Sequence, residues 1–163
     1  MKIQPLNIDS KKKYILVYTI CFIVMAFAAS LPWIVTGTSF VWKIDGQGQH
    51  YPALVYLGQT LREFFVGVFS GHPKWNMWDL NIGFGSDVVG TLNYYCIGDP
   101  LDLLSVFVPK AYTEYLYEFL IIFRMYLAGL AFSAFAFYKK AKYYPTLIGA
   151  FVYTFSGYVL MYG

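Results

Sequence analysis

The feature that most constrains this chain is an uncharged run of 22 residues from Tyr14 to Val35. A helix of that length is about 33 Å long, which matches the hydrocarbon core of a lipid bilayer. Three lysines at 11–13 come directly before the run. A basic stretch also begins a signal peptide, but the apolar region there is usually about 7–15 residues long. The pattern therefore predicts an uncleaved membrane span at 14–35, with Pro32 bending or ending its last turn and Trp33 at the interface.

Two further apolar stretches follow, at 114–138 and 143–163. The first of them carries Glu118 near one end and Arg124 well inside, and the second has Pro145 in its first turn. Only 13% of the residues are charged, whereas soluble domains carry about a quarter. Lipid is therefore the expected solvent for much of the chain. We expect an all-α integral membrane protein with three transmembrane helices.

The lysines predict how these spans are oriented. Half of the twelve basic residues lie in two short clusters that flank the apolar runs, at 11–13 and at Lys139, Lys140 and Lys142. Basic flanks mark the cytoplasmic side of a membrane. The tail 1–13 and the turn 139–142 should thus be cytoplasmic, and residues 36–113 should form an extracytoplasmic loop. A solvated basic face for nucleic acid is not visible, so no nucleic-acid partner is expected.

The long loop is predicted to contain two helices next to the membrane. Apolar residues recur at steps of three and four between 52 and 69, and Gln59, Arg62 and Glu63 fall on the other side. This pattern is typical of a helix lying along the membrane surface. Asp99 and Pro100 suit the start of a shorter helix at about 100–108. Turns are expected at 83–86 and at Gly90.

Asp45 is the best candidate for a catalytic group. It follows the first span and opens the stretch Asp-Gly-Gln-Gly-Gln-His-Tyr-Pro, which also contains Gln49, His50 and Tyr51. A carboxylate that is partly desolvated at a membrane surface gains proton affinity, which suits general base catalysis. The same stretch also has the composition of an ordinary loop turn, so a purely structural role stays open.

Other polar groups suggest ligands without a strict motif. Asp45 and His50, with His72 as a further candidate, could bind a divalent metal ion, but no paired ligand spacing supports such a site. Trp78 lies in a stretch of aromatic, Asn and Asp residues that suits sugar stacking or interface anchoring equally. Arg124 would be costly inside a span unless it is paired or hydrated. It could bind a lipid phosphate, pair with a carboxylate on another helix, or extend to the interface.

The order of these features resembles the N-terminal part of the YfhO-type bacterial membrane proteins, which are similar to the GT-C superfamily of polytopic glycosyltransferases. The features that carry the resemblance are the first span, Asp45-Gly46 with Tyr51-Pro52, the surface helix, Trp78 with Gly83-Phe84-Gly85, Asp99-Pro100-Leu101, Arg124, and the stretch from Tyr153 to Tyr158.

The resemblance implies a function and a location. It implies transfer of a sugar from a polyprenyl-phosphate donor to an extracytoplasmic glycan, such as a teichoic acid, at the bacterial plasma membrane. It places Asp45 where an acidic catalytic residue is expected, and the helices 52–69 and 100–108 where the two juxtamembrane helices lie. Members of the family have about a dozen spans, so further spans beyond Gly163, or a partner subunit, are expected to complete the donor cavity.

Two other functions remain open from the sequence. Gly129 with Ser133, and Gly149 with Gly157, could form small-residue faces through which a non-enzymatic membrane subunit assembles with other helices. A transporter fragment is the third hypothesis, and Arg124 is its main support.

Overall fold

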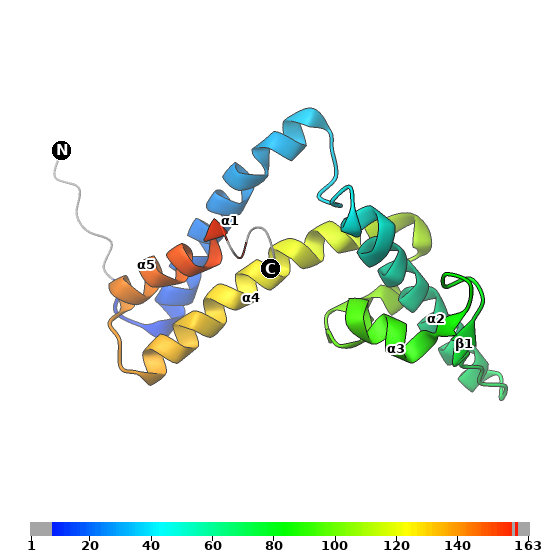
Figure 1. The fold of residues 1–163 in the computed structure, drawn as a ribbon. Helices are drawn as coiled ribbons and strands as arrows, with labels where there is room; N and C mark the ends of the chain where they lie inside the picture. The colour runs from blue at the N-terminus through cyan, green and yellow to red at the C-terminus, as the bar shows by residue number, and fades with distance from the viewer. Residues whose placement is uncertain (1–7, 158, 160–163) are drawn as a thin grey trace. The chain divides into compact units, whose positions relative to one another are not determined.

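The computed structural model describes residues 8–157 and residue 159 of the 163-residue chain (Figure 1). The chain divides into two compact units. The first, here called the helical unit, consists of Met1–Thr38 with Ile121–Gly163, and the second, here called the loop unit, is Ser39–Leu120.

The helical unit is built from α1 (Lys11–Thr36), most of α4 (Thr113–Tyr138) and α5 (Tyr143–Thr154). The Ser10 hydroxyl accepts a hydrogen bond from the Lys13 amide at 3.3 Å and so caps the start of α1. Gly37 ends the helix with φ of 63°, a conformation that favours glycine. Pro32 lies inside α1, which continues to Thr36, so the expectation that this proline could end the helix is wrong.

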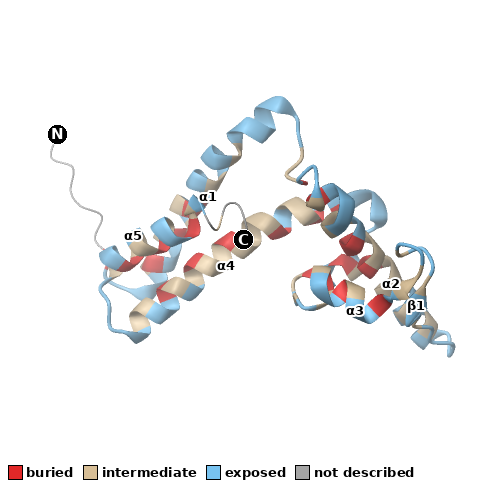
Figure 2. Cartoon of the chain, in the orientation of Figure 1, coloured by how far each residue is buried: buried red, intermediate tan, exposed pale blue. Residues whose placement is uncertain are grey.

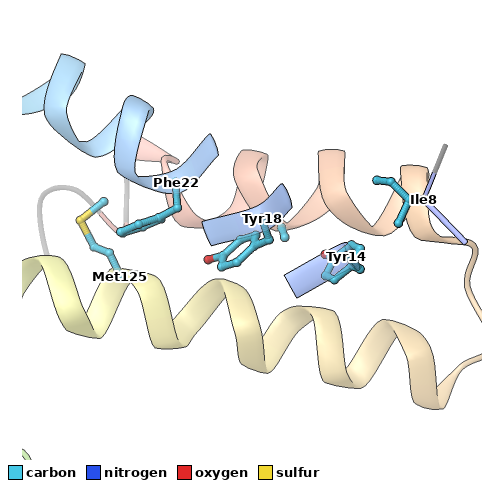
Figure 3. Packing of buried hydrophobic residues seen from close by; sticks show 6 residues of the cluster. Ile8, Tyr14, Tyr18, Phe22 and Met125 are labelled. Carbon is cyan, nitrogen blue, oxygen red and sulfur yellow. The ribbon is translucent and has the colours of Figure 1, made fainter. Parts of the chain in front are cut away.

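An aromatic stripe on α1 forms the core of the helical unit (Figure 3). Tyr14, Tyr18 and Phe22 follow one another at intervals of four, so they share one face of the helix. Figure 3 shows them between α1 and the neighbouring helices, with Met125 of α4 beside Phe22. The Tyr18 hydroxyl donates to the backbone carbonyl of Tyr126 at 3.0 Å, which satisfies this buried donor.

Small residues allow the three helices to approach closely. A Cβ atom on Gly129 would overlap the Tyr18 hydroxyl of α1 and would also meet Thr154 of α5. Ser133 donates to the Gly129 carbonyl at 2.7 Å, so its oxygen is left to accept from the Tyr14 hydroxyl at 2.8 Å. The face formed by Gly129 and Ser133 is therefore occupied within the chain.

Large apolar side chains cover the outside of α1. Figure 2 shows much of this helix as exposed, and its exposed residues include Ile15, Leu16, Ile20, Ile23, Val24 and Phe27. Two helical stretches, Lys11–Thr36 and Lys110–Tyr138, are long and apolar enough to cross a membrane. In the most apolar windows of these stretches only 22% and 17% of residues are buried, which is unlike the core helix of a soluble protein.

The third expected span, at 143–163, is described only in part. Helix α5 has 12 residues and ends at Thr154, which is shorter than a bilayer crossing requires. The rest of the expected span includes residues 158 and 160–163, which lie outside the described residues.

The loop unit consists of short helical elements around one long helix, with a small hairpin. The long helix is α2 (Tyr51–Phe69). The other elements are a π-helix at Gly46–His50, the antiparallel strands β1 (Trp78–Asp79) and β2 (Ser86–Asp87), α3 (Val88–Leu92), a second π-helix at Asn93–Ile97, two 3-10 helices at Asp102–Phe107 and Lys110–Tyr112, and the start of α4.

Helix α2 packs into the loop unit along the first half of its apolar stripe. Leu57 contacts a cluster with Val88, Leu92 and Cys96, and Leu54 contacts Leu116 and Leu120 at the start of α4. Only the second half of the stripe stays exposed, at Phe65 and Val68 among others. The expected surface helix therefore exists, but its first two turns are part of a protein core.

Two local predictions for the loop are wrong. Gly90 was expected in a turn but lies inside α3, because the Asp87 carboxylate accepts a hydrogen bond from its amide and starts the helix there. The stretch expected as a helix at 100–108 is a 3-10 helix that begins at Asp102. Asp99 lies in the turn before it, where its carboxylate accepts from the Leu101 amide at 2.8 Å, and Leu101 is the N-cap residue.

Candidate functional site

Asp45 lies at the entrance to a π-helix and not in a loop turn. The helical path begins at Asp45, runs as a π-helix through Gly46–His50 and continues without a break into α2. The interpretation of this stretch as an ordinary turn is therefore wrong. Single π-helical turns are rare and occur frequently at functional sites.

Close packing around Gly46 produces this turn. Gly46 is buried, and a Cβ there would lie 3.0 Å from the Cβ of Trp42. The Gln47 amide donates to the Trp42 carbonyl at 2.7 Å, a five-residue step that widens the helix. Gly48, by contrast, has open space where a side chain would be. The turn thus has one face packed and one face accessible.

The segment before Asp45 is held by the start of α4. The Phe40 amide donates to the Glu118 carboxylate at 3.1 Å, and the Val41 amide donates to the Ser39 hydroxyl at 3.1 Å. These bonds direct the chain into the π-helix. Glu118 was expected near one end of a span. Its carboxylate instead helps to position the segment that precedes Asp45.

The Asp45 carboxylate is half-buried and makes no capping hydrogen bond to the helix that it precedes. Within residues 8–157 its oxygens accept no hydrogen bond and form no ion pair. The carboxylates of three other aspartates in the loop unit accept hydrogen bonds from nearby residues. Asp79 accepts from Tyr56 and Asn81, Asp87 accepts from Gly90, and Asp99 accepts from Leu101. Asp45 is thus a carboxylate without a structural partner beside an accessible surface.

Tyr95 brings Gln49 and His50 together. Its hydroxyl donates to the Gln49 side-chain oxygen at 3.0 Å, and its ring meets the His50 ring edge-on with 5.4 Å between centroids. Tyr51 contacts Tyr117 of α4 in the same edge-on manner at 6.3 Å. Tyr95 belongs to the second π-helix, and no motif in the sequence signals its role.

Trp78 lies in the hairpin. It pairs with Asp87 across the strands, its side chain is 63% exposed, and its indole nitrogen lies close to Gly85. The hairpin itself is fastened to α2, because the Tyr56 hydroxyl donates to the Asp79 carboxylate at 2.6 Å.

Arg124 belongs to the helical unit, where it lies half-buried on α4 beside Met125. Its role as a phosphate ligand stays a prediction. Among the described residues no three His, Cys, Asp or Glu side chains gather into a group that could hold a metal ion.

Arg62 is a structural residue that sequence reasoning assigned to a polar outer face. It is half-buried, and its guanidinium donates to the carbonyls of Ser105 and Val108, each at 2.7 Å. These bonds hold the 3-10 helix against α2 where Gly58 permits a close approach, since a Cβ on Gly58 would lie 2.7 Å from the Ser105 carbonyl oxygen.

The fold is that of a mostly helical membrane protein with two long apolar helices and a folded loop unit. The chain matches the model of the family described as bacterial membrane protein YfhO over residues 16–163, and it therefore belongs to that family. This match confirms the resemblance noted from the sequence. Neither a curated protein nor a solved structure matches the chain.

Proposed function

We propose that this chain carries the acceptor-activating part of a membrane glycosyltransferase. The donor is a sugar linked to a polyprenyl phosphate, and the acceptor is an extracytoplasmic cell-envelope glycan such as a teichoic acid. Membership of a bacterial membrane protein family and the resemblance to GT-C enzymes support the class. The observation that carries the proposal is the Asp45 carboxylate, which is half-buried and bonded to none of the described residues.

In the proposed reaction Asp45 acts as the general base. It removes the proton of an acceptor hydroxyl while that oxygen forms a bond to the anomeric carbon of the donor sugar. The bond from this carbon to the phosphate oxygen breaks, its electron pair leaves with the lipid phosphate, and the anomeric configuration inverts. The proton on Asp45 is then released to water. A carboxylate that no structural donor already occupies is available for such a transfer.

The other predicted residues take binding roles in this proposal. Gln49, His50 and Tyr51 contact the sugar or the acceptor from the first turns next to Asp45, and Trp78 offers an exposed ring for stacking. Arg124 stabilises the leaving phosphate, for which its forked donors are suited. A divalent metal ion would share that task, and the described residues hold no ready cluster for it.

The subunit alternative loses part of its support, although Gly157 of the second small-residue face has open space around it. Gly129 and Ser133 contact Tyr18 and Tyr14 inside the helical unit, and a Cβ on Gly149 would meet the Phe132 ring at 2.9 Å. These small residues serve packing within the chain and leave less surface for a partner helix.

Replacing Asp45 by Asn tests the proposal in the full protein. We expect transfer of sugar to the envelope polymer to fall about 100-fold to 10,000-fold, the usual contribution of a general base. Folding should be unchanged, because the carboxylate bonds to no described residue. Asp87→Asn is the matched control, since Asn caps a helix as well as Asp and α3 should stay intact. Transfer at the wild-type rate by Asp45→Asn would remove Asp45 from the mechanism.

A further inference from the structure

A pocket of about 480 Å³ lies at one end of the helical unit, where α4 turns into α5. It is formed by residues far apart in the sequence, since Ile8 and Lys11 from the start of the chain meet Phe137, Lys140, Lys142 and Tyr143. Lysines from both basic clusters therefore line one pocket, although the two clusters are far apart in the sequence.

The described residues that line the pocket carry a net positive charge. Three of its lining residues are lysines, and none is acidic. The nearby ion pair between Lys13 and Asp9, at 3.7 Å, involves neither a lining lysine nor a lining carboxylate. Like charges that share a cavity repel one another, so an anion bound among them relieves that repulsion.

Lys140 has a backbone conformation that the fold alone does not favour. Its φ of 61° lies in the left-handed region. It occupies the position after α4 where the Ala141 amide donates to the Ala136 carbonyl at 3.0 Å and the Lys140 amide to the Phe137 carbonyl at 2.9 Å. This helix ending normally uses glycine, because a side chain there is strained. A lysine that occupies a strained position and lines a pocket points to a use for its charge.

The apolar side chains that line the pocket include two packed aromatic rings. The rings of Phe137 and Tyr143 meet edge-on at 5.4 Å, and both contact Tyr14, at 4.8 Å and 5.9 Å. Ile8 beside them is only 5% exposed. The lining of the pocket thus combines lysine cations with apolar side chains, which suits a ligand that has a phosphate and a hydrocarbon part.

We propose that this pocket binds the phosphate group of an anionic phospholipid. The chain belongs to a membrane protein family, so such lipids surround it, and basic pockets between membrane helices are suited to their headgroups. A zwitterionic lipid carries its own cation beside the phosphate and should bind less well. The inference does not depend on the proposed glycosyltransferase activity.

Two lysines provide matched controls. Lys12 and Lys139 belong to the same clusters but do not line the pocket. Lys139 instead lies 5.8 Å and 5.7 Å from the ring centres of Phe135 and Tyr138. A general attraction of basic residues to an anionic membrane would depend on all of these lysines alike, whereas a site depends on those that line it.

Native mass spectrometry of the full chain in neutral detergent tests the proposal, with phosphatidylglycerol and phosphatidylcholine as probes. We expect one phosphatidylglycerol to be retained in preference to phosphatidylcholine. Lys140→Gln and Lys142→Gln should each weaken its retention about five-fold, the contribution of one lysine near an anionic surface. Lys12→Gln and Lys139→Gln should leave it unchanged. Equal retention of the two lipids, or equal loss in all four variants, would overturn the proposal.

Two further arms complete the test. Lys140→Gly removes the charge and relieves the strained φ, so its melting temperature should be at least that of the wild type while phosphatidylglycerol retention falls as in Lys140→Gln. Wild-type retention by this variant would refute a role for the Lys140 charge. Inorganic phosphate should displace bound phosphatidylglycerol only weakly. If phosphate displaced the lipid when both were present at equal concentrations, the site would be assigned to free phosphate and not to the lipid.

Discussion

Tyr56 on α2 donates a hydrogen bond to the Asp79 carboxylate on β1, with 2.6 Å between the oxygens. The other oxygen of Asp79 accepts from the backbone and side-chain amides of Asn81 at 2.8 Å and 2.9 Å. The hydrogen bonds from Tyr56 and Asn81 lower the pKa of Asp79. Burial, with the adjoining Asp79, raises the pKa of Tyr56 to about 12. This pair fastens the exposed hairpin to the long helix of the loop unit.

Tyr56→Phe should raise the pKa of Asp79 toward its ordinary value, because the main donor to the carboxylate is lost. A lowered pKa in the folded state means that Asp79 contributes stability above its ordinary pKa of 3.8, and that this is lost as pH falls through the folded value. Carbon NMR of the Asp79 carboxyl during an acid titration measures the change. Tyr94→Phe is the control, since Tyr94 is 77% exposed. An unchanged titration in Tyr56→Phe would contradict the assigned hydrogen bond.

Gly129→Ala should destabilise the helical unit by about 1–3 kcal/mol, the usual cost of overpacking. The added methyl group would overlap the Tyr18 hydroxyl and lie 2.5 Å from the Thr154 hydroxyl oxygen. Thermal unfolding in detergent gives the change in melting temperature. Gly157→Ala has open space for the same methyl group and should melt like the wild type. A normal melting temperature for Gly129→Ala would mean that the helices do not approach at this residue.

Arg62→Ala should loosen the 3-10 helix at Asp102–Phe107, because the carbonyls of Ser105 and Val108 lose a charged donor. Each such bond contributes about 1.5–3 kcal/mol when buried, and less here because Arg62 is only half-buried. Hydrogen exchange should speed up in residues 102–108, while Glu63→Ala, which alters an exposed neighbour, should not change it. Unchanged exchange in Arg62→Ala would show that other contacts hold this element.

The apolar runs of the sequence predicted the long helices well, because length and hydropathy decide whether a helix can cross a bilayer. Helices α1 and α4 cover the runs expected at 14–35 and 114–138, and α2 begins next to Pro52 as its periodicity indicated. These features depend on local sequence.

The site could be predicted only in part, because its geometry depends on contacts between distant residues. The π-helix after Asp45 forms where Gly46 packs closely against Trp42. The sequence alone does not show this contact, and its two glycines predict a turn. Tyr95 lies 46 residues from Gln49, and nothing in the sequence links them. Arg62 was assigned to solvent because helix periodicity does not show which backbone carbonyls lie nearby.

The central claim is that the loop unit displays Asp45 on the extracytoplasmic side of the membrane, and cysteine labelling in intact bacterial cells tests it most directly. Gly48→Cys suits the label because the position has open space. Cys21→Ser removes one native thiol. The other, Cys96, is buried, and burial with the charge of Asp102 raises its pKa to about 12, so it should react slowly.

A membrane-impermeant maleimide should label Gly48→Cys in intact cells, whereas Lys139→Cys in the lysine-rich turn should be labelled only after lysis. Labelling of Gly48→Cys only after lysis would place Asp45 in the cytoplasm, apart from its proposed acceptor, and would contradict the account.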